Sequence, residues 1–87
     1  MSNFLEYFTS ANRAGVEFIL TDLNLAMAFL DVAAASTDSY VIRRNHDNAR
    51  TAYATIADLL GKLRLDETQR QAIETKLDTL GARLALL

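Results

Sequence analysis

Between Val16 and Ala35 most positions are apolar, and the few polar residues fall close to one line of a helical wheel. Those polar residues are Glu17, Thr21, Asn24 and Asp31. One apolar stripe carries Val16, Ile19, Leu20, Leu23, Met27, Leu30 and Ala34, and a second carries Phe18, Leu25, Phe29 and Val32. A helix that is apolar over most of its circumference must be covered on more than one side. We therefore predict a long helix over residues 16–35, with the rest of the chain packed around it.

A second helix is predicted over residues 39–60, because its apolar positions step by four and three as in a bundle seam. The seam consists of Ile42, His46, Ala49, Tyr53, Ile56, Leu60 and Leu63. The opposite side is polar, with Arg44, Asn48, Thr51, Thr55, Asp58 and Lys62. Thr37 or Asp38 is the predicted N-cap, and Gly61 occupies the place of a left-handed C-cap.

The third predicted helix covers residues 66–86 and begins with a capping box, since Asp66 and Gln69 have the required spacing. Its apolar seam is Ile73, Leu77, Leu80, Leu84 and Leu87. Arg70 and Glu74 are four apart and should pair on its surface. An interior glycine costs about 1 kcal/mol relative to alanine. We therefore expect Gly81 to mark a close approach of a neighbouring helix backbone.

Residues 1–15 allow two interpretations. Ser2 can cap a short separate helix that packs on the bundle, with Ser10 or Asn12 capping a fresh start and Gly15 weakening any continuation. Alternatively, the segment extends the first long helix and carries its aromatic residues on a projecting end.

Composition supports an all-α fold. The 87 residues contain no proline and only three glycines, and 51% of them are apolar. A chain of this length forms one domain, and short connections make neighbouring helices antiparallel. The prediction is an up-down-up three-helix bundle over residues 1–87, in which 1–15 are a variable N-terminal segment that adds a short helix under the first interpretation.

The net charge and the cysteine content limit which cellular locations and partners fit the chain. The chain has no cysteine, so disulfides and thiolate chemistry are excluded. No signal peptide is visible in residues 1–7, and Glu17, Asp22 and Asp31 argue against a membrane-spanning 16–35 segment. The net charge of −2 gives no general attraction to nucleic acid or acidic lipid. We expect a cytoplasmic protein with no membrane partner.

His46 is the only histidine, and it lies in the predicted seam. It could act as a phosphoryl acceptor or a general base. No second histidine, cysteine or carboxylate stands at metal-ligand spacing with it, and a half-buried structural role is favoured.

Arg43, Arg44 and Arg50 form a small basic cluster with Asp47 among them. Such a cluster can contact phosphate. It spreads over more than one helical face and lacks interleaved aromatic residues, so a solvated surface is the favoured interpretation.

No catalytic, metal or cofactor site is predicted. The carboxylates are explained by caps and surface positions, and no nucleophile, Gly-rich phosphate loop or convergent acid–base set is present. The sequence therefore predicts that the protein is not an enzyme and needs no cofactor.

The excess of aromatic and aliphatic residues in the N-terminal third is the feature of the sequence that indicates a function most strongly. The first helix has more apolar surface than two partner helices need. We predict that part of it forms a homo-oligomer interface or binds another helical protein. The candidate residues are Phe4, Leu5, Tyr7, Phe8, Phe18, Leu25, Phe29 and Val32.

The segment from Asn48 to Leu84 resembles short uncharacterised bacterial all-helical proteins with an N-A-R-x-A-Y-x-T signature and a leucine-rich last helix. The Leu23–Ser36 stretch fits the same pattern, and the resemblance covers roughly residues 16–87. It implies a small helical fold and transfers no site. A fainter similarity to tetratricopeptide helices rests on Ala49 and Tyr53, but that repeat's other positions are missing.

Two functional classes are consistent with the sequence. The favoured one is a small helical interaction or scaffold module that self-associates. The alternative is a nucleic-acid or phosphate-binding regulator that uses Arg43, Arg44 and Arg50.

Overall fold

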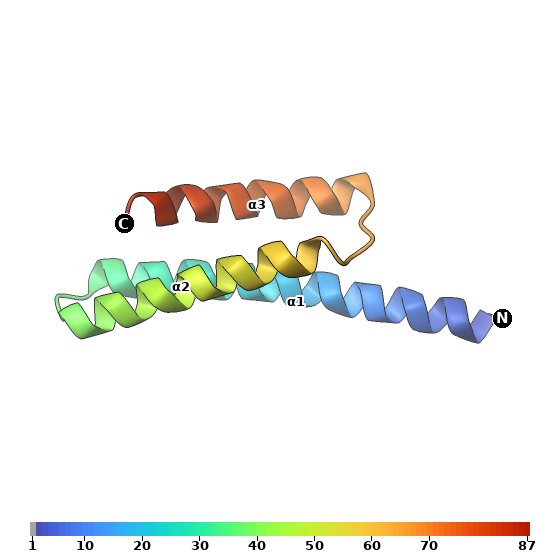
Figure 1. Cartoon of the computed structure of the whole chain (residues 1–87), viewed down its shortest axis with the longest axis horizontal. Coiled ribbons are helices and arrows are strands. Elements are labelled where there is room, and N and C mark those ends of the chain that lie inside the picture. The colour runs from blue at the N-terminus through green and yellow to red at the C-terminus, as the bar shows by residue number, and fades with distance from the viewer. Residues whose placement is uncertain (1) are drawn as a thin grey trace.

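The computed structural model describes the backbone of residues 2–87 and the side chains of residues 11–87. It consists of three helices, α1 (Ser2–Ala35), α2 (Ser39–Leu60) and α3 (Glu67–Ala85). Successive helices run in opposite directions (Figure 1), so the predicted all-α, up-down-up arrangement is confirmed. The molecule is elongated, with extents of 56 × 20 × 17 Å.

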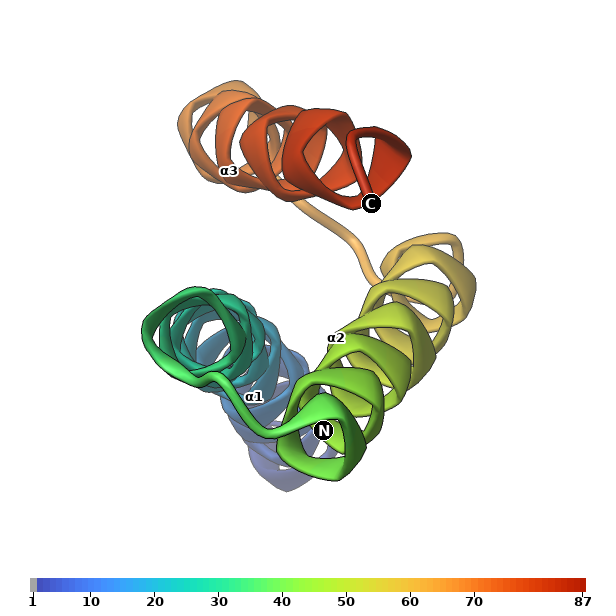
Figure 2. The same cartoon turned by 90° about the vertical axis from the view of Figure 1, so that its left-hand side faces the viewer.

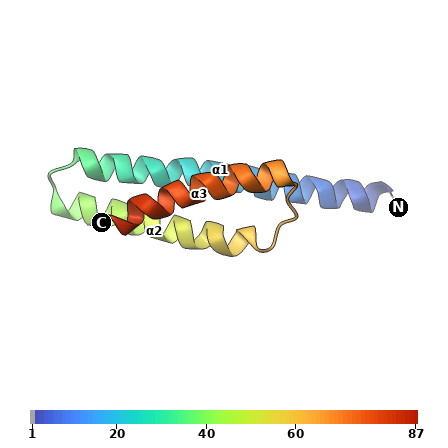
Figure 3. The ribbon, with the colours of Figure 1, turned by 90° about the horizontal axis from the view of Figure 1, so that it is seen from above.

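α1 is longer than the predicted helix, because it starts at Ser2 and passes through Gly15 without a break. The second interpretation of the N-terminal segment is therefore the one that the backbone adopts. Seen from above, the first turns of α1 project past α2 and α3 (Figure 3).

The α2–α3 connection explains why α1 stays helical at Gly15. A Cβ atom at Gly15 would lie 2.7 Å from a Cδ atom of Leu63, so only glycine lets Leu63 pack this close. Nearby, the Asn12 side chain donates to the Arg64 carbonyl oxygen at 2.7 Å and accepts from the Arg64 N–H at 3.0 Å. Asn12 is thus a tertiary anchor, and the interpretation of this residue as a helix cap is wrong.

Local capping fixes the start of α2. Asp38 is the N-cap, and its carboxylate accepts from the N–H groups of Tyr40 at 2.8 Å and Val41 at 3.2 Å. Ser36 Oγ accepts from the Asp38 N–H, which holds the corner that precedes the helix. These bonds satisfy backbone donors that have no partner inside the helix.

The start of α3 is fixed in the same way. The Gln69 N–H donates to Asp66 at 2.7 Å, and the Gln69 side chain accepts from the Asp66 N–H at 3.2 Å, so the predicted capping box is confirmed. Arg70 and Glu74 form the predicted surface pair at 3.6 Å.

Gly61 differs from the prediction. Its φ of −69° and ψ of −14° are right-handed, so the expected left-handed C-cap is wrong. The Gly61 N–H donates to the Leu59 carbonyl, and the last turn of α2 simply tightens before the chain leaves it.

Because a non-glycine residue can adopt this conformation, we expect Gly61→Ala to stabilise the protein by about 0.4–1 kcal/mol. A Cβ at this position would meet only the Asp58 carbonyl oxygen, at an ordinary 3.6 Å. Urea unfolding followed by circular dichroism measures the change. Gly81→Ala is the comparison, since its Cβ would lie 3.2 Å from the Tyr53 ring and must displace it. Destabilisation by Gly61→Ala would contradict the right-handed conformation.

The core runs along the contact between α1 and α2 and is closed from one side by α3 (Figure 2). Alanines line the α1–α2 contact, and small side chains let two helix backbones approach closely. Among the described residues the buried apolar set is Val16, Ile19, Leu23, Ala26, Leu30, Ala33, Ala49, Ala52, Ile56, Ile73 and Leu80. The predicted seam of α2 is broadly correct, with Ala52 as a buried addition.

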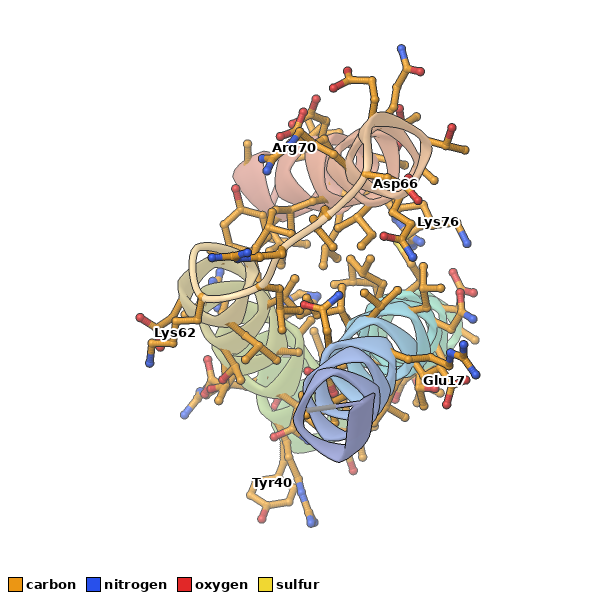
Figure 4. The ribbon with its side chains drawn as sticks, turned by 90° about the vertical axis from the view of Figure 1, so that its right-hand side faces the viewer. Glu17, Tyr40, Lys62, Asp66, Arg70 and Lys76 are labelled. Carbon is orange, nitrogen blue, oxygen red and sulfur yellow. The ribbon has the colours of Figure 1, made fainter. Side chains whose placement is uncertain are left out.

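α3 is held mainly by Ile73 and Leu80, which are its two buried residues. The ring of Tyr53 lies against Gly81, with atoms 3.2–3.5 Å from the place of a Cβ. The expected backbone approach at Gly81 is therefore wrong, because an aromatic side chain from α2 fills the space. Figure 4 shows apolar side chains filling the layer between α3 and the other two helices.

Candidate functional site

The second apolar stripe of α1 is left uncovered within the described chain. Phe18, Leu25 and Val32 are 51%, 47% and 49% exposed, and Phe29 is partly buried. Phe18, Leu25 and Val32 are spaced by seven residues, which places them on one side of a helix. We call Phe18, Leu25, Phe29 and Val32 the open face.

A groove runs beside the open face, between α1 and α2. Its volume is about 410 Å³, and it is lined by Phe18, Asp22, Phe29, Asn48, Thr51, Ala52 and Thr55. The α1 wall is mainly apolar and the α2 wall is mainly polar, which matches the outer side predicted for α2. The groove is thus apolar along one edge and able to form hydrogen bonds along the other.

The position of α3 explains why the open face stays bare. Figure 2 shows α3 over one side of the α1–α2 pair, with nothing on the opposite side. Ile19 and Leu23 point into the core and are almost fully buried, whereas Phe18 points away from it. The two partner helices cover the side of α1 that carries Ile19 and Leu23, and Phe18, Leu25 and Val32 fall outside the covered side.

Of the eight predicted interface residues, Phe18, Leu25 and Val32 are exposed and Phe29 is partly buried. The side chains of the other four lie outside the described residues; they are Phe4, Leu5, Tyr7 and Phe8. The backbone of this segment is helical and continuous with the rest of α1.

The polar line of α1 faces a different direction. Figure 4 shows Glu17 on the outer side of α1, and Asp31 pairs with Arg83 of α3 at 3.0 Å. Arg83 also lies 3.8 Å from the Met27 sulfur. This exposed pair contributes about 0–1 kcal/mol, and it tethers the end of α3 to α1 on the side away from the groove.

His46 is half-buried in mainly apolar surroundings. It lines a hollow of about 230 Å³ with Leu30, Ala33, Ala34, Ile42, Arg83 and Leu87. No Asp or Glu side chain shares that lining, and the described residues contain no group of three metal-ligating side chains.

Two of the three arginines of the basic cluster line one hollow, and the third pairs with an aspartate of that hollow. Arg50 pairs with Asp47 at 3.3 Å. Arg44 and Arg43 line a shallow hollow with Tyr40, Asp47 and Asn48. Because Asn48 also lines the groove, this hollow continues the groove toward the start of α2. Tyr40, which is 68% exposed, projects from α2 away from α3 (Figure 4).

By length and composition, one segment of α1 could cross a membrane: Ala11–Ala35, with a mean hydropathy of 1.6. Part of that apolar character belongs to the core, because six of the segment's residues are buried within the bundle and Leu20 and Met27 pack against them. The exposed large apolar side chains of the segment are Phe18, Leu25 and Val32 of the open face.

Sequence reasoning did not single out Asp22, Tyr40 or Asn48 as members of a site. Nothing in their local pattern distinguishes them from other surface residues. Only the packing of α2 against α1 brings them beside the open face.

No protein-family model matches this chain, and neither a curated protein nor a solved structure shows significant similarity to it.

Proposed function

We propose that the protein is a small helical interaction module that self-associates through the open face. The observation that carries the proposal is the row of three large apolar side chains, Phe18, Leu25 and Val32, each about half exposed along one helix. Burying a large apolar side chain is worth about 1.5–3 kcal/mol. A contiguous exposed row of them is typical of a protein interface.

The charges near the open face favour a protein helix over a lipid surface as the partner. Helices that lie on membranes are rich in Lys and Arg on their polar side. The Ala11–Ala35 segment has one basic residue, Arg13, against three acidic ones. Asn48, Thr51 and Thr55 beside the groove can instead form hydrogen bonds with a second protein surface.

The proposal assigns no catalytic activity and no cofactor. A module of this kind acts by holding chains together, and its groove is suited to the apolar side of an amphipathic helix. We also propose that the protein works in the cytoplasm and belongs with the short bacterial helical proteins that the Asn48–Leu84 segment resembles. That resemblance assigns no site residue.

Self-association is tested by size-exclusion chromatography with light scattering, from low to high micromolar protein. We expect the wild-type mass to rise with concentration. The variant Phe18→Gln/Leu25→Gln/Val32→Thr should remain a monomer, because it removes the apolar area and leaves the core untouched.

The matched control is Ala54→Gln/Ala57→Gln, which adds polar bulk at exposed positions of α2 away from the groove. It should self-associate like the wild type, and circular dichroism should show equal helicity in all three proteins. A wild type that stays monomeric at high micromolar concentration would rule out the proposal.

A further inference from the structure

We propose that the open face is occupied by α1 of a second copy in antiparallel orientation, with the two-fold axis between Leu25 and Ala28. In this arrangement Arg44 of each copy faces Asp22 of the other. The inference rests on the proposed function and specifies the geometry of that self-association. Three features of the described residues support it: the spacing of large and small side chains, the charges beside them, and the level of α2 along α1.

The first feature is a seven-residue pattern of large and small residues. Large side chains occur at Phe18, Leu25 and Val32, and small ones occur between them at Thr21, Ala28 and Ala35. In paired helices, a large side chain packs best into a hole bordered by small ones. Antiparallel pairing about the proposed axis sets each large residue against a small one, namely Phe18 against Ala35, Leu25 against Ala28 and Val32 against Thr21. Parallel pairing would set large against large and leave gaps at the small layers.

The second feature is the acidic charge beside the seam. In a parallel pair, residues five apart on opposite helices meet at the flank of the seam. Glu17 and Asp22 have this separation, so a parallel dimer would bring two carboxylates together on both flanks. Antiparallel pairing about the proposed axis avoids this repulsion and sets Asp22 near Phe29 of the second copy. Like-charge contacts of this kind select one orientation over another.

The third feature is where Arg44 lies along the bundle. α2 runs antiparallel to α1, with Asn12 bonded to Arg64 at one end and a three-residue corner at the other. This alignment puts Arg44 about level with Asp31 of α1. In the proposed dimer, the two-fold axis places the level of Asp31 in one copy beside Asp22 of the second copy. Arg44 therefore comes close to Asp22 of the second copy. Tyr40, which precedes Arg44 by one helical turn, comes beside Phe18 of the second copy.

Arg44 and Asp22 are available for this contact. Among the described side chains, neither forms an ion pair within its own chain. Arg44 lines the hollow that continues the groove, and Asp22 lines the groove itself. The two-fold symmetry would form the pair twice in each dimer.

The size of the contact predicts a weak, reversible dimer. The two α1 helices would overlap for about 18 residues, or about 27 Å. With the adjoining α2 surface, each copy would bury on the order of half of the roughly 800 Å² per partner of a standard interface. The total lies at the low end of specific interfaces, where transient complexes are found. We therefore expect dissociation in the micromolar range.

The orientation is tested by disulfide trapping, which the absence of native cysteine makes unambiguous. Thr21→Cys and Val32→Cys are prepared separately, mixed and oxidised, and the products are identified by mass spectrometry. Antiparallel pairing brings these two different positions together, so the mixed disulfide should dominate. Ala54→Cys, at an exposed position away from the groove, is the control and should give little product.

The outcomes separate this inference from the proposed function. Disulfides of each variant with itself would mean a parallel dimer and would overturn the inference, while self-association stands. A dimer by light scattering that traps no mixed disulfide would also overturn it. A monomer by light scattering with no trapping would remove the proposed function as well.

The charge contact is tested by exchange of the two residues. Asp22→Arg and Arg44→Asp alone should each weaken dimerisation about tenfold, because each sets like charges together at two symmetric places. The double exchange Asp22→Arg/Arg44→Asp should restore the wild-type dissociation constant. Single variants that dimerise like the wild type, or a double variant that stays weak, would overturn the Arg44–Asp22 contact.

Discussion

Replacing Ile56 with aspartate is expected to unfold the protein. Ile56 lies near the C-terminal end of α2 and is fully buried in the core that α1, α2 and α3 share. The substitution removes an apolar side chain worth several kcal/mol in the core and leaves a carboxylate without a partner. A chain of this size has a total stability of about 4–13 kcal/mol, so a loss of this kind consumes most of it. Far-UV circular dichroism should show loss of helix at room temperature.

Two further variants test whether the burial of residue 56 causes the loss of stability. Ala57→Asp places the same charge on the next residue, which is exposed, and should change the free energy of unfolding by no more than about 0.5 kcal/mol. Ile56→Val keeps the site apolar and should cost about 0.5–1.5 kcal/mol. A folded Ile56→Asp protein with a normal urea midpoint would mean that α2 presents a different side to α1.

The second large effect is expected at Leu80, which anchors α3. Leu80→Ala should lower the free energy of unfolding by about 2.7–5 kcal/mol, because it leaves a cavity where the side chain is fully buried. α3 has only Ile73 as a second buried residue, so few contacts can compensate. Urea unfolding followed by circular dichroism gives the difference.

Leu86 provides the matched control, because it is the same residue type at the end of the same helix and is 87% exposed. Leu86→Ala should be silent within about 0.5 kcal/mol. Equal losses of unfolding free energy for Leu80→Ala and Leu86→Ala would contradict the side of α3 that packs against the core. Loss of α3 protection in hydrogen exchange, with α1 and α2 still protected, would show that α3 opens as a separate unit.

The candidate surface was only partly predictable. The surplus of apolar residues on the first long helix follows from counting positions on a wheel, and it correctly indicated that one stripe would exceed what two helices can cover. Which residues border that stripe depends on how α2 lies along α1. Asp22 on α1 lies more than twenty positions before Arg44 and Asn48 on α2, and no local pattern links it to them.

Local interactions between neighbouring residues were determined by the sequence alone. The Asp38 cap, the Asp66–Gln69 capping box and the inner and outer sides of α2 all depend on residues within about four positions of one another. Helical periodicity and the unpaired N–H groups of a helix start operate at that range. Their outcome is the same in almost any tertiary setting.

Longer-range features were decided only by the tertiary structure. α1 continues through Gly15 because Leu63 packs on it and Asn12 bonds to Arg64, and Gly81 is explained by the ring of Tyr53. These partners lie roughly thirty to fifty positions away along the chain. The open face of α1 has the same origin: the side on which α3 packs determines which apolar stripe is buried and which stays exposed. Packing against distant residues carries this information, because burial is a property of the assembled helices and not of any one of them.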